Sequence, residues 1–274
     1  YGQADRDPLP APRKRDTIAV QSDDLPELPS GFDTTYDPSD WPAGEEAAKR
    51  RLTAFAKKTI DDYDEARNLP GVDGTSALSP HLSVGSISPR QCMHAAVEAN
   101  GGKAELEDSG AAVWMSEIVW REFYKHILVG FPRVSRARAY QPKTERIEWS
   151  HDEDDFARWC EGKTGFPIVD AGMRQLAETG WMHNRLRMIS AMFLTKDLWL
   201  DWRKGERHFM RTLVDGDLAS NNGGWQWSAS TGTDAQPYFR VFNPTSQSQK
   251  FDADGEFIQR FVPELKDVEG KAIH

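Results

Sequence analysis

Apolar residues recur at helical spacing through most of the chain beyond residue 44. The first apolar face holds Leu52, Phe55, Ile60 and Tyr63, and Pro70-Gly71 ends its segment. Further predicted helices cover about residues 88–100, 109–129, 153–161, 170–179, 182–199, 206–213 and 255–261. Because neither an alternating strand pattern nor an internal repeat occurs, the sequence predicts one all-α domain over residues 45–274.

Residues 1–44 differ from this pattern, because they hold seven of the 16 prolines and show little periodicity. Such a composition is typical of a linker or of an arm lying on a surface. The chain also begins at Tyr1 inside this polar stretch. We therefore expect a piece of a longer protein, cut in a linker.

Composition excludes several classes of protein. With 28% charged and 38% hydrophobic residues, the 274-residue chain is neither disordered nor collagen-like. Its apolar runs are far shorter than the ~20 residues of a membrane-spanning helix. Cys92 and Cys160 lie in no metal-ligand spacing, which favours free, buried thiols in a reducing compartment. We expect a cytoplasmic monomer with neither a metal site nor a membrane partner.

The net charge of −9 argues against binding to nucleic acid, but the charge is unevenly distributed. Residues 121–146 hold only two acids, Glu122 and Glu145. Their cations are Arg121, Lys125, Arg133, Arg136, Arg138, Lys143 and Arg146. This basic stretch is either a phosphate-binding surface or a solvated helix face and loop.

Three clusters of polar and aromatic residues are poor core material. In residues 181–188, a helix would place Asn184, Arg187 and Met188 on one face. In residues 114–124, one stripe holds Glu117, Trp120, Arg121 and Tyr124. Residues 215–227 combine two acids, amides and glycines, which predicts a tight polar turn. Together they indicate a pocket rich in Trp and Arg; the alternative is core tryptophans with helix-capping acids.

Four segments carry a family resemblance: residues 120–124, 164–170, 181–188 and 215–227. They resemble the flavin-binding region of the photolyase/cryptochrome family, above all of class I cyclobutane pyrimidine dimer photolyases. The resemblance covers about residues 35–274. It implies an all-helical domain that holds FAD folded and repairs pyrimidine dimers in DNA by light-driven electron transfer from FADH⁻. It also implies that an α/β antenna domain and the last C-terminal helix are missing here, so a folate or deazaflavin antenna is expected only in the full-length protein.

The resemblance assigns residues to FAD. The pyrophosphate region corresponds to Tyr63, Thr75, Ser76, Ala77, Leu78 and Ser79, although family members often have Arg in place of Ala77. Further cofactor-binding positions are Arg121, Trp181, Asn184, Arg187, Asp215, Gly216, Asp217 and Asn221. Among these, Arg187 and Asp215 resemble an ion pair beside the isoalloxazine, and Asn221 resembles the residue facing flavin N5.

It also assigns residues to DNA and to electron transfer. The expected cleft for the flipped dimer contains Glu117, Trp120, Asn184, Met188 and Trp227. Further expected DNA contacts are Arg67, Arg121, Tyr124, Arg185 and Gln247. Trp225, Trp202 and Trp149 resemble the family's chain of three tryptophans, with Trp149 outermost. With Glu117 and Asn221, these three are the candidate catalytic residues.

Three other functions compete with dimer repair. A (6-4) photolyase has His at the positions of Asn184 and Met188, unlike this sequence. A cryptochrome would keep FAD and the tryptophans but alter the cleft, against which Glu117, Trp120 and Met188 argue. A helical DNA-binding module without a cofactor leaves residues 215–222 unexplained.

Overall fold

The computed structural model describes residue 10 and residues 37–104 and 109–274. Its α-helices are α1 (Glu45–Lys58), α2 (Tyr63–Ala66), α3 (Ser79–Val84), α4 (Pro89–Ala99), α5 (Gly110–Gly130), α6 (Glu153–Cys160), α7 (Pro167–Thr179), α8 (Asn184–Met192), α9 (Trp202–Thr212), α10 (Leu218–Ser228), α11 (Pro244–Phe251) and α12 (Glu256–Phe261). Within these residues, strand pairing is limited to one isolated bridge between Ser150 and Leu200. The predicted all-α fold is confirmed. No helix in this part of the chain is both long and apolar enough to cross a membrane.

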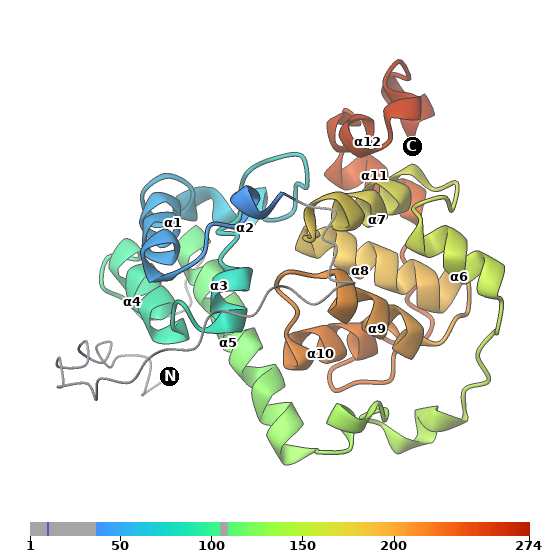
Figure 1. The fold of residues 1–274 in the computed structure, drawn as a ribbon, viewed down its shortest axis with the longest axis horizontal. Coiled ribbons are helices and arrows are strands. Elements are labelled where there is room, and N and C mark those ends of the chain that lie inside the picture. The colour runs from blue at the N-terminus through green and yellow to red at the C-terminus, as the bar shows by residue number, and fades with distance from the viewer. Residues whose placement is uncertain (1–9, 11–36, 105–108) are drawn as a thin grey trace, which may run out of the picture.

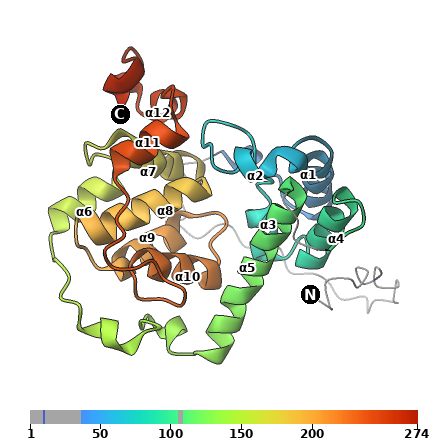
Figure 2. The ribbon, with the colours of Figure 1, turned by 180° about the vertical axis from the view of Figure 1, so that it is seen from behind.

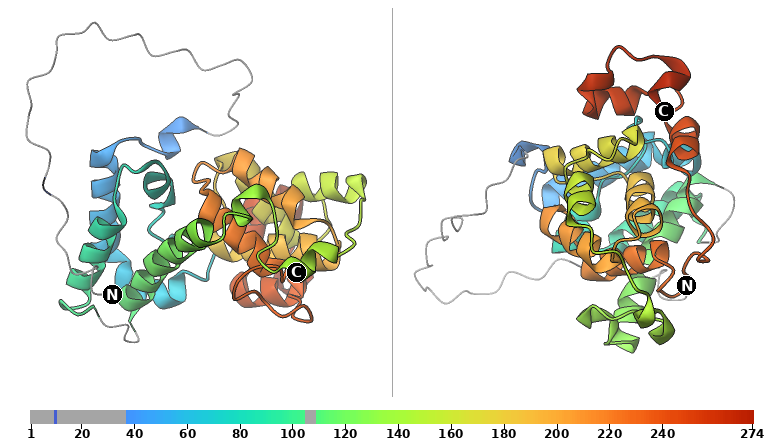
Figure 3. Two further views of the ribbon diagram at one scale, coloured as in Figure 1. Left: turned by 90° about the horizontal axis from the view of Figure 1, so that it is seen from below. Right: turned by 90° about the vertical axis from the view of Figure 1, so that its right-hand side faces the viewer.

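The helices form two groups, each with its own core (Figure 1). In the first group, α1 to α5 enclose residues such as Phe55, Ile60 and Met115. In the second, α6 to α12 enclose residues such as Trp159 and Phe209. Helix α5 extends from the first group to the second, as the left view of Figure 3 shows. The N-terminal half of α5 is therefore core, and its C-terminal half is free to line a site between the groups.

Side-chain caps explain where several helices begin. Ser88 and Gln91 form a reciprocal capping box at α4. Ser109 caps α5, and Asp201 caps α9 by accepting from the Arg203 amide. The predicted second and third helices thus start where their sequence signals lie. Most of the predicted proline-rich arm, residues 1–9 and 11–36, lies outside the described residues.

The predicted turn over residues 215–227 is wrong, because most of it is helix α10. Asp217 is the N-cap, and its Oδ1 accepts a hydrogen bond from the Ser220 amide at 3.0 Å. The glycines inside α10 serve close packing: a Cβ at Gly223 would lie 2.2 Å from the Tyr124 ring of α5. Tertiary packing therefore overrides the low helix propensity of this segment.

Other helix boundaries also differ from the prediction. The single helix predicted over 182–199 ends as α8 at Met192, followed by a π-helical turn over Phe193–Asp197. Helix α9 begins at Trp202, four residues before the predicted 206. Helix α7 begins at Pro167, three residues before the predicted 170. The short helices α3 and α11 were not predicted, although Asn243-Pro244 is a cap and first-turn signal for α11.

The segment between α5 and α6, residues 131–152, runs along the second group without an α-helix (Figures 1 and 2). Two of its five cations, Arg133 and Arg138, share the carboxylate of Glu145 within the protein. Glu145 lies 2.8 Å from Arg203, 3.5 Å from Arg133 and 3.9 Å from Arg138. The basic stretch of residues 121–146 is therefore in part an internal ion-pair network rather than a free phosphate-binding surface.

Candidate functional site

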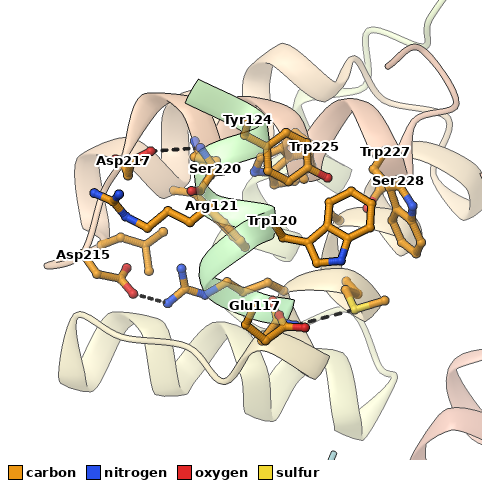
Figure 4. A pocket seen from close by; sticks show the side chains of 18 of the residues that line it. Glu117, Trp120, Arg121, Tyr124, Asp215, Asp217, Ser220, Trp225, Trp227 and Ser228 are labelled. Carbon is orange, nitrogen blue, oxygen red and sulfur yellow. Dashed lines mark hydrogen bonds and ion pairs between the residues drawn. The ribbon is translucent and has the colours of Figure 1, made fainter. Parts of the chain in front are cut away.

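A cavity of about 420 Å³ lies where α5 meets α8, α9 and α10. Its lining residues are Glu117, Trp120, Arg121, Tyr124, Asn184, Arg187, Met188, Ala191, Phe209, Leu213, Asp215, Asp217, Ser220, Asn221, Gly224, Trp225, Trp227, Ser228 and Asp234. All three clusters picked out in the sequence thus meet in one pocket. Its volume is within the ~300–1,000 Å³ of small-molecule sites. Figure 4 shows Asp215 and Asp217 at one end and Trp120 and Trp227 at the other.

The predicted ion pair between Arg187 and Asp215 forms the polar end. Arg187 Nη2 donates to Asp215 Oδ2 at 2.7 Å, and Arg187 Nε donates to the Met182 carbonyl at 2.8 Å. The side chain of Asp215 is only 1% exposed. Its other oxygen, Oδ1, is buried and has no hydrogen-bond partner among the described residues. That orphaned acceptor at the pocket wall would be satisfied by a hydrogen-bond donor of a bound ligand.

Asp217 lies beside this ion pair and is held by Lys125, a residue that the sequence analysis did not assign to the site. Lys125 Nζ donates to Asp217 Oδ2 at 2.6 Å. Burial raises the pKa of Asp217, but the hydrogen bonds from Lys125 and Ser220 and the charge of Lys125 outweigh it, so the pKa lies below its usual value. The carboxylate therefore stays charged at the N-terminus of α10, where the helix dipole favours a negative group.

Asn221 lies one turn into α10, and its Nδ2 donates to the Glu206 carbonyl at 3.0 Å. This bond fixes the amide side chain and leaves Oδ1 available at the pocket. Glu206 itself is buried, and burial raises the pKa of its carboxyl group. The backbone of α9 thus orients the residue for which the resemblance implies a contact with flavin N5.

The aromatic end of the pocket is open to solvent. Trp120 is 41% exposed and packs against Phe123 and Tyr124, with ring centroids 5.3 and 6.2 Å away. Burial is the main cause that raises the pKa of Tyr124 to about 12, so its hydroxyl stays protonated. Glu117 faces the same end and pairs with Arg67 at 2.9 Å.

On α8, Asn184 and Met188 share one face as predicted, with Nδ2 and Sδ 3.9 Å apart. Both line the pocket together with Arg187 and Ala191, which continue the same face. The i, i+3, i+4 argument made from the sequence is therefore confirmed for this helix.

The predicted pyrophosphate turn, residues 75–79, lies outside the cavity lining, whereas α3, which begins at its last residue, contacts the polar end. Ser83 on α3 donates to the Gly216 carbonyl at 2.9 Å, and Arg121 Nη2 donates to the Leu82 carbonyl at 3.1 Å. Trp181 Nε1 donates to Ser79 Oγ at 3.4 Å, which joins two of the predicted cofactor residues.

Within that turn, individual residues differ in what they can offer. Ala77 adopts a positive φ of 44°, and the Ser76 carbonyl already accepts from Arg51. Leu78 is fully buried in the first core, so only its backbone is available to a ligand. A further predicted cofactor residue, Tyr63, also belongs to that core.

The remaining predicted DNA contacts lie beyond the pocket. Arg185 Nη2 donates to Asn68 Oδ1, and its guanidinium lies 4.3 Å from the Phe251 ring centroid. Burial, and then the neighbouring charge of Arg67, lower the pKa of Arg185. Gln247, which is half-buried, precedes Phe251 by one turn of α11. Because the charge of Arg67 contributes to this lowered pKa, Arg67 and Arg185 lie close enough for their charges to repel.

Of the three predicted relay tryptophans, only Trp225 lines the pocket. Trp225 and Trp202 are 2% and 1% exposed, whereas Trp149 is half-buried at the edge of the second core. Trp225 packs directly on α9: a Cβ at Gly205, one turn after Trp202, would lie 2.1 Å from its ring. The three tryptophans thus lie at the pocket, in the core and at the core edge, and their role as a relay stays a prediction.

Several lining residues were missed by the sequence analysis: Ala191, Phe209, Leu213, Ser220, Gly224, Ser228 and Asp234. Helical spacing could have found two of them. Ala191 lies one turn after Arg187 and Met188. Gly224 lies one turn after Asn221, which would have been evident if residues 218–228 had been read as a helix. Phe209 and Leu213 approach only through the packing of α9.

His183 gives a testable pH dependence at the base of the site. Its Nδ1 accepts from the Arg185 amide at 3.2 Å and caps α8, so the neutral imidazole is required. Burial, followed by the charges of Arg187, Arg185 and Arg67, lowers its pKa to about 4. Because the unfolded chain binds this proton near pH 6.5 and the folded chain does not, stability falls as pH drops from about 6.5 toward 4.

Each pKa unit corresponds to about 1.4 kcal/mol, so this effect amounts to about 3 kcal/mol. Between pH 7 and pH 4.5, chemical unfolding should show about 2 kcal/mol more loss of unfolding free energy for the wild type than for His183→Gln, which keeps an acceptor but does not titrate. Equal pH dependence of the two proteins would exclude His183 as the titrating group.

The fold and the pocket define an all-helical ligand-binding domain with an acidic, arginine-paired end and an aromatic end. Residues 114–274 match the family model described as FAD binding domain of DNA photolyase. The chain therefore belongs to the DNA photolyase FAD-binding domain family.

Similar proteins agree with this assignment. A deoxyribodipyrimidine photo-lyase of Vibrio cholerae is 54% identical over 238 residues, which cover 87% of this chain and 50% of that protein. The crystal structure of a class III photolyase from Agrobacterium tumefaciens matches with a TM-score of 0.81 and 47% identity, covering 86% of this chain and 48% of the other. A Synechocystis cryptochrome matches with a TM-score of 0.78 and 33% identity, covering 87% and 52%. The chain spans about half the length of these relatives.

Proposed function

We propose that this chain binds one FAD and repairs cyclobutane pyrimidine dimers in DNA under light. The observation that carries the proposal is that one pocket combines a buried Arg187–Asp215 ion pair at one end with the exposed Trp120 at the other. A single site can thus hold a cofactor ring system and present it to an aromatic-lined opening. The V. cholerae relative is named a deoxyribodipyrimidine photo-lyase, which supports the proposal.

The residues present fit FAD at the polar end. The orphaned Asp215 Oδ1 needs a donor, and Asn221, whose Nδ2 is held by the Glu206 carbonyl, lines the same pocket. Arg121 and the turn at the start of α3 would hold the phosphates; the far end of α3 is tied to Gly216 by Ser83 and to Arg121 by the Leu82 carbonyl. FAD held there in its reduced form would supply the light-driven electron transfer that dimer repair requires. The protein contributes position and charge to this chemistry.

The open end suits an extruded dimer. Pyrimidine dimers stack poorly in duplex DNA, so flipping one out costs little. Trp120 and Trp227 line the opening and offer ring faces for the two bases. Glu117 and Asn184 can hydrogen-bond to base edges, although Glu117 must then share its carboxylate with Arg67.

Arg67 and Arg185 are proposed to contact the DNA backbone. The pKa of Arg185 is lowered by burial and by the charge of Arg67, which means that the two cations repel each other. A phosphate beside them would relieve this repulsion and release a counterion. The overall charge of −9 makes such local pairs more important, because the protein as a whole repels DNA.

A light sensor without repair activity is the main competing function, since a cryptochrome shares the fold at 33% identity. The two functions differ at the aromatic end. A photoreceptor has no need of a wall that discriminates damaged from undamaged DNA.

Trp120→Ala tests this difference. Removing one stacking wall should weaken binding to dimer-containing DNA by about 1–3 kcal/mol, or about 5- to 150-fold, and leave undamaged DNA almost unaffected. Titrations of both DNAs at one salt concentration measure the effect. Phe166→Ala removes an aromatic of similar exposure, 39%, outside the pocket, and serves as the matched control. Equal losses on both DNAs after Trp120→Ala would contradict the proposed cleft.

A further inference from the structure

Trp199 has an unusual backbone conformation for a large residue. Its φ is 57°, in the left-handed region, and its side chain is 48% exposed. This conformation is unfavourable for a residue with a Cβ. Two hydrogen bonds hold it: Trp199 Nε1 donates to the Glu148 carbonyl, and the Ser150 amide donates to the Trp199 carbonyl, both at 2.8 Å. Strain that is maintained in this way often marks a functional position.

The conformation places Trp199 against Trp149. Their ring centroids lie 5.3 Å apart at an interplanar angle of 46°. The parallel bridge between Ser150 and Leu200 sets the register that pairs the two preceding residues. Trp149 is half-buried and packs on the second core, whereas nearly half of Trp199 is in solvent. The two indoles therefore form a continuous aromatic path from the core edge to the surface.

We propose that Trp199 is the outer end of the tryptophan chain, through which electrons enter from a reductant in solution. This inference rests on the proposed function and on the tryptophan chain that the family resemblance implies, in which Trp149, Trp202 and Trp225 connect the surface with the FAD site. It moves the solvent-facing end from Trp149, where the sequence analysis placed it, to Trp199.

Charge stabilisation gives the direction of transfer. Trp149 and Trp199 are the same chemical group, so their surroundings decide which ring carries a positive charge. A charge is costly away from water, which favours the exposed ring of Trp199. The Glu148 carbonyl also accepts from Trp199 Nε1, and that hydrogen bond becomes stronger when the indole is cationic.

The electrons and protons balance if a thiol is the reductant. After light has drawn one electron from the chain toward oxidised flavin, Trp149 is a radical cation. Trp199 gives it one electron and becomes the radical cation itself. A thiol in solution then reduces Trp199, becomes a thiyl radical and releases its proton to water.

The competing role for Trp199 is a lid that shields Trp149 from solution. The two roles predict opposite changes in the rate of photoreduction when the side chain is removed in Trp199→Ala. We expect both Trp199→Phe and Trp199→Ala to slow thiol-dependent photoreduction of bound FAD several-fold. A lid predicts no change for Trp199→Phe and faster photoreduction for Trp199→Ala. Trp41→Phe, another partly buried indole that donates to a carbonyl, is the matched control.

A chemical readout complements the rates. After illumination in air without thiol, peptide mass spectrometry should find the oxidised tryptophan at Trp199, and at Trp149 in Trp199→Phe. Oxidation of Trp149 in the wild type with Trp199 intact overturns this inference but leaves the proposed function standing. If the flavin-loaded protein photoreduces normally even as Trp149→Phe, the whole tryptophan chain is wrong. A protein that retains no FAD contradicts the proposed function itself and, with it, this inference.

Discussion

Arg187→Ala is expected to lower the free energy of unfolding by about 3–5 kcal/mol, because it leaves the Asp215 carboxylate buried without its partner. The side chain of Asp215 is 1% exposed, so water cannot replace the guanidinium. The substitution also removes the donor to the Met182 carbonyl, which ties the start of α8 to the pocket. Chemical denaturation of the purified protein measures the loss.

Two controls define the origin of this effect. Lys163→Ala breaks an ion pair with Glu161 whose side chains are 64% and 57% exposed, and should cost at most about 1 kcal/mol. Arg187→Met combined with Asp215→Asn removes both charges and should recover much of the stability. A loss for Arg187→Ala as small as that for Lys163→Ala would mean that Asp215 is solvated in solution.

Trp149→Phe is expected to abolish photoreduction of oxidised FAD almost completely while dimer repair by chemically reduced protein stays near normal. Phenylalanine keeps the aromatic packing at the edge of the second core but is much harder to oxidise than indole. Repair needs an electron to pass only between the cofactor and the dimer, so it does not use Trp149. Photoreduction needs an electron from outside, which must cross this position.

The two activities should be measured on one preparation under one light source. Flavin absorbance reports photoreduction in the presence of thiol, and release of intact thymines from a dimer-containing oligonucleotide reports repair. Wild-type photoreduction in Trp149→Phe would return Trp149 to a packing role. Parallel loss of both activities would point to damage to the fold or to FAD binding instead.

Local patterns in the sequence predicted much of the fold, because they are properties of single helices. The face of Leu52 and Phe55 is buried in α1, and the Ser88 cap opens α4 as expected. Asn184, Arg187 and Met188 needed only helical spacing to be placed together. Such inferences succeed wherever one element decides the outcome.

The failures arise where packing between elements decides. Residues 218–228 resemble a turn because Asn and Gly are weak helix formers, yet Gly223 is needed against Tyr124 of another helix. The pairing of Asp217 with Lys125 joins residues 92 apart in the chain. Trp199 gave no signal at all, since its importance depends on a backbone φ of 57° and on Trp149 beside it.

The resemblance supplied what spacing could not: the pairing of Arg187 with Asp215 across 28 residues, and FAD as the expected ligand. Ion pairs of this kind have no sequence periodicity, so no local rule predicts them. The structure adds interactions that the resemblance did not include, such as the hydrogen bond from Asn221 Nδ2 to the Glu206 carbonyl.

Light-dependent repair by this chain is the most direct test of the account. The purified protein, loaded with FAD and chemically reduced, is mixed with an oligonucleotide that contains one cyclobutane thymine dimer and is illuminated with blue light. Chromatography of the DNA should show restored thymines that accumulate with light dose, and none in darkness or with oxidised flavin. A protein that retains FAD and binds the damaged DNA, yet restores no thymines under light, would contradict the proposed function.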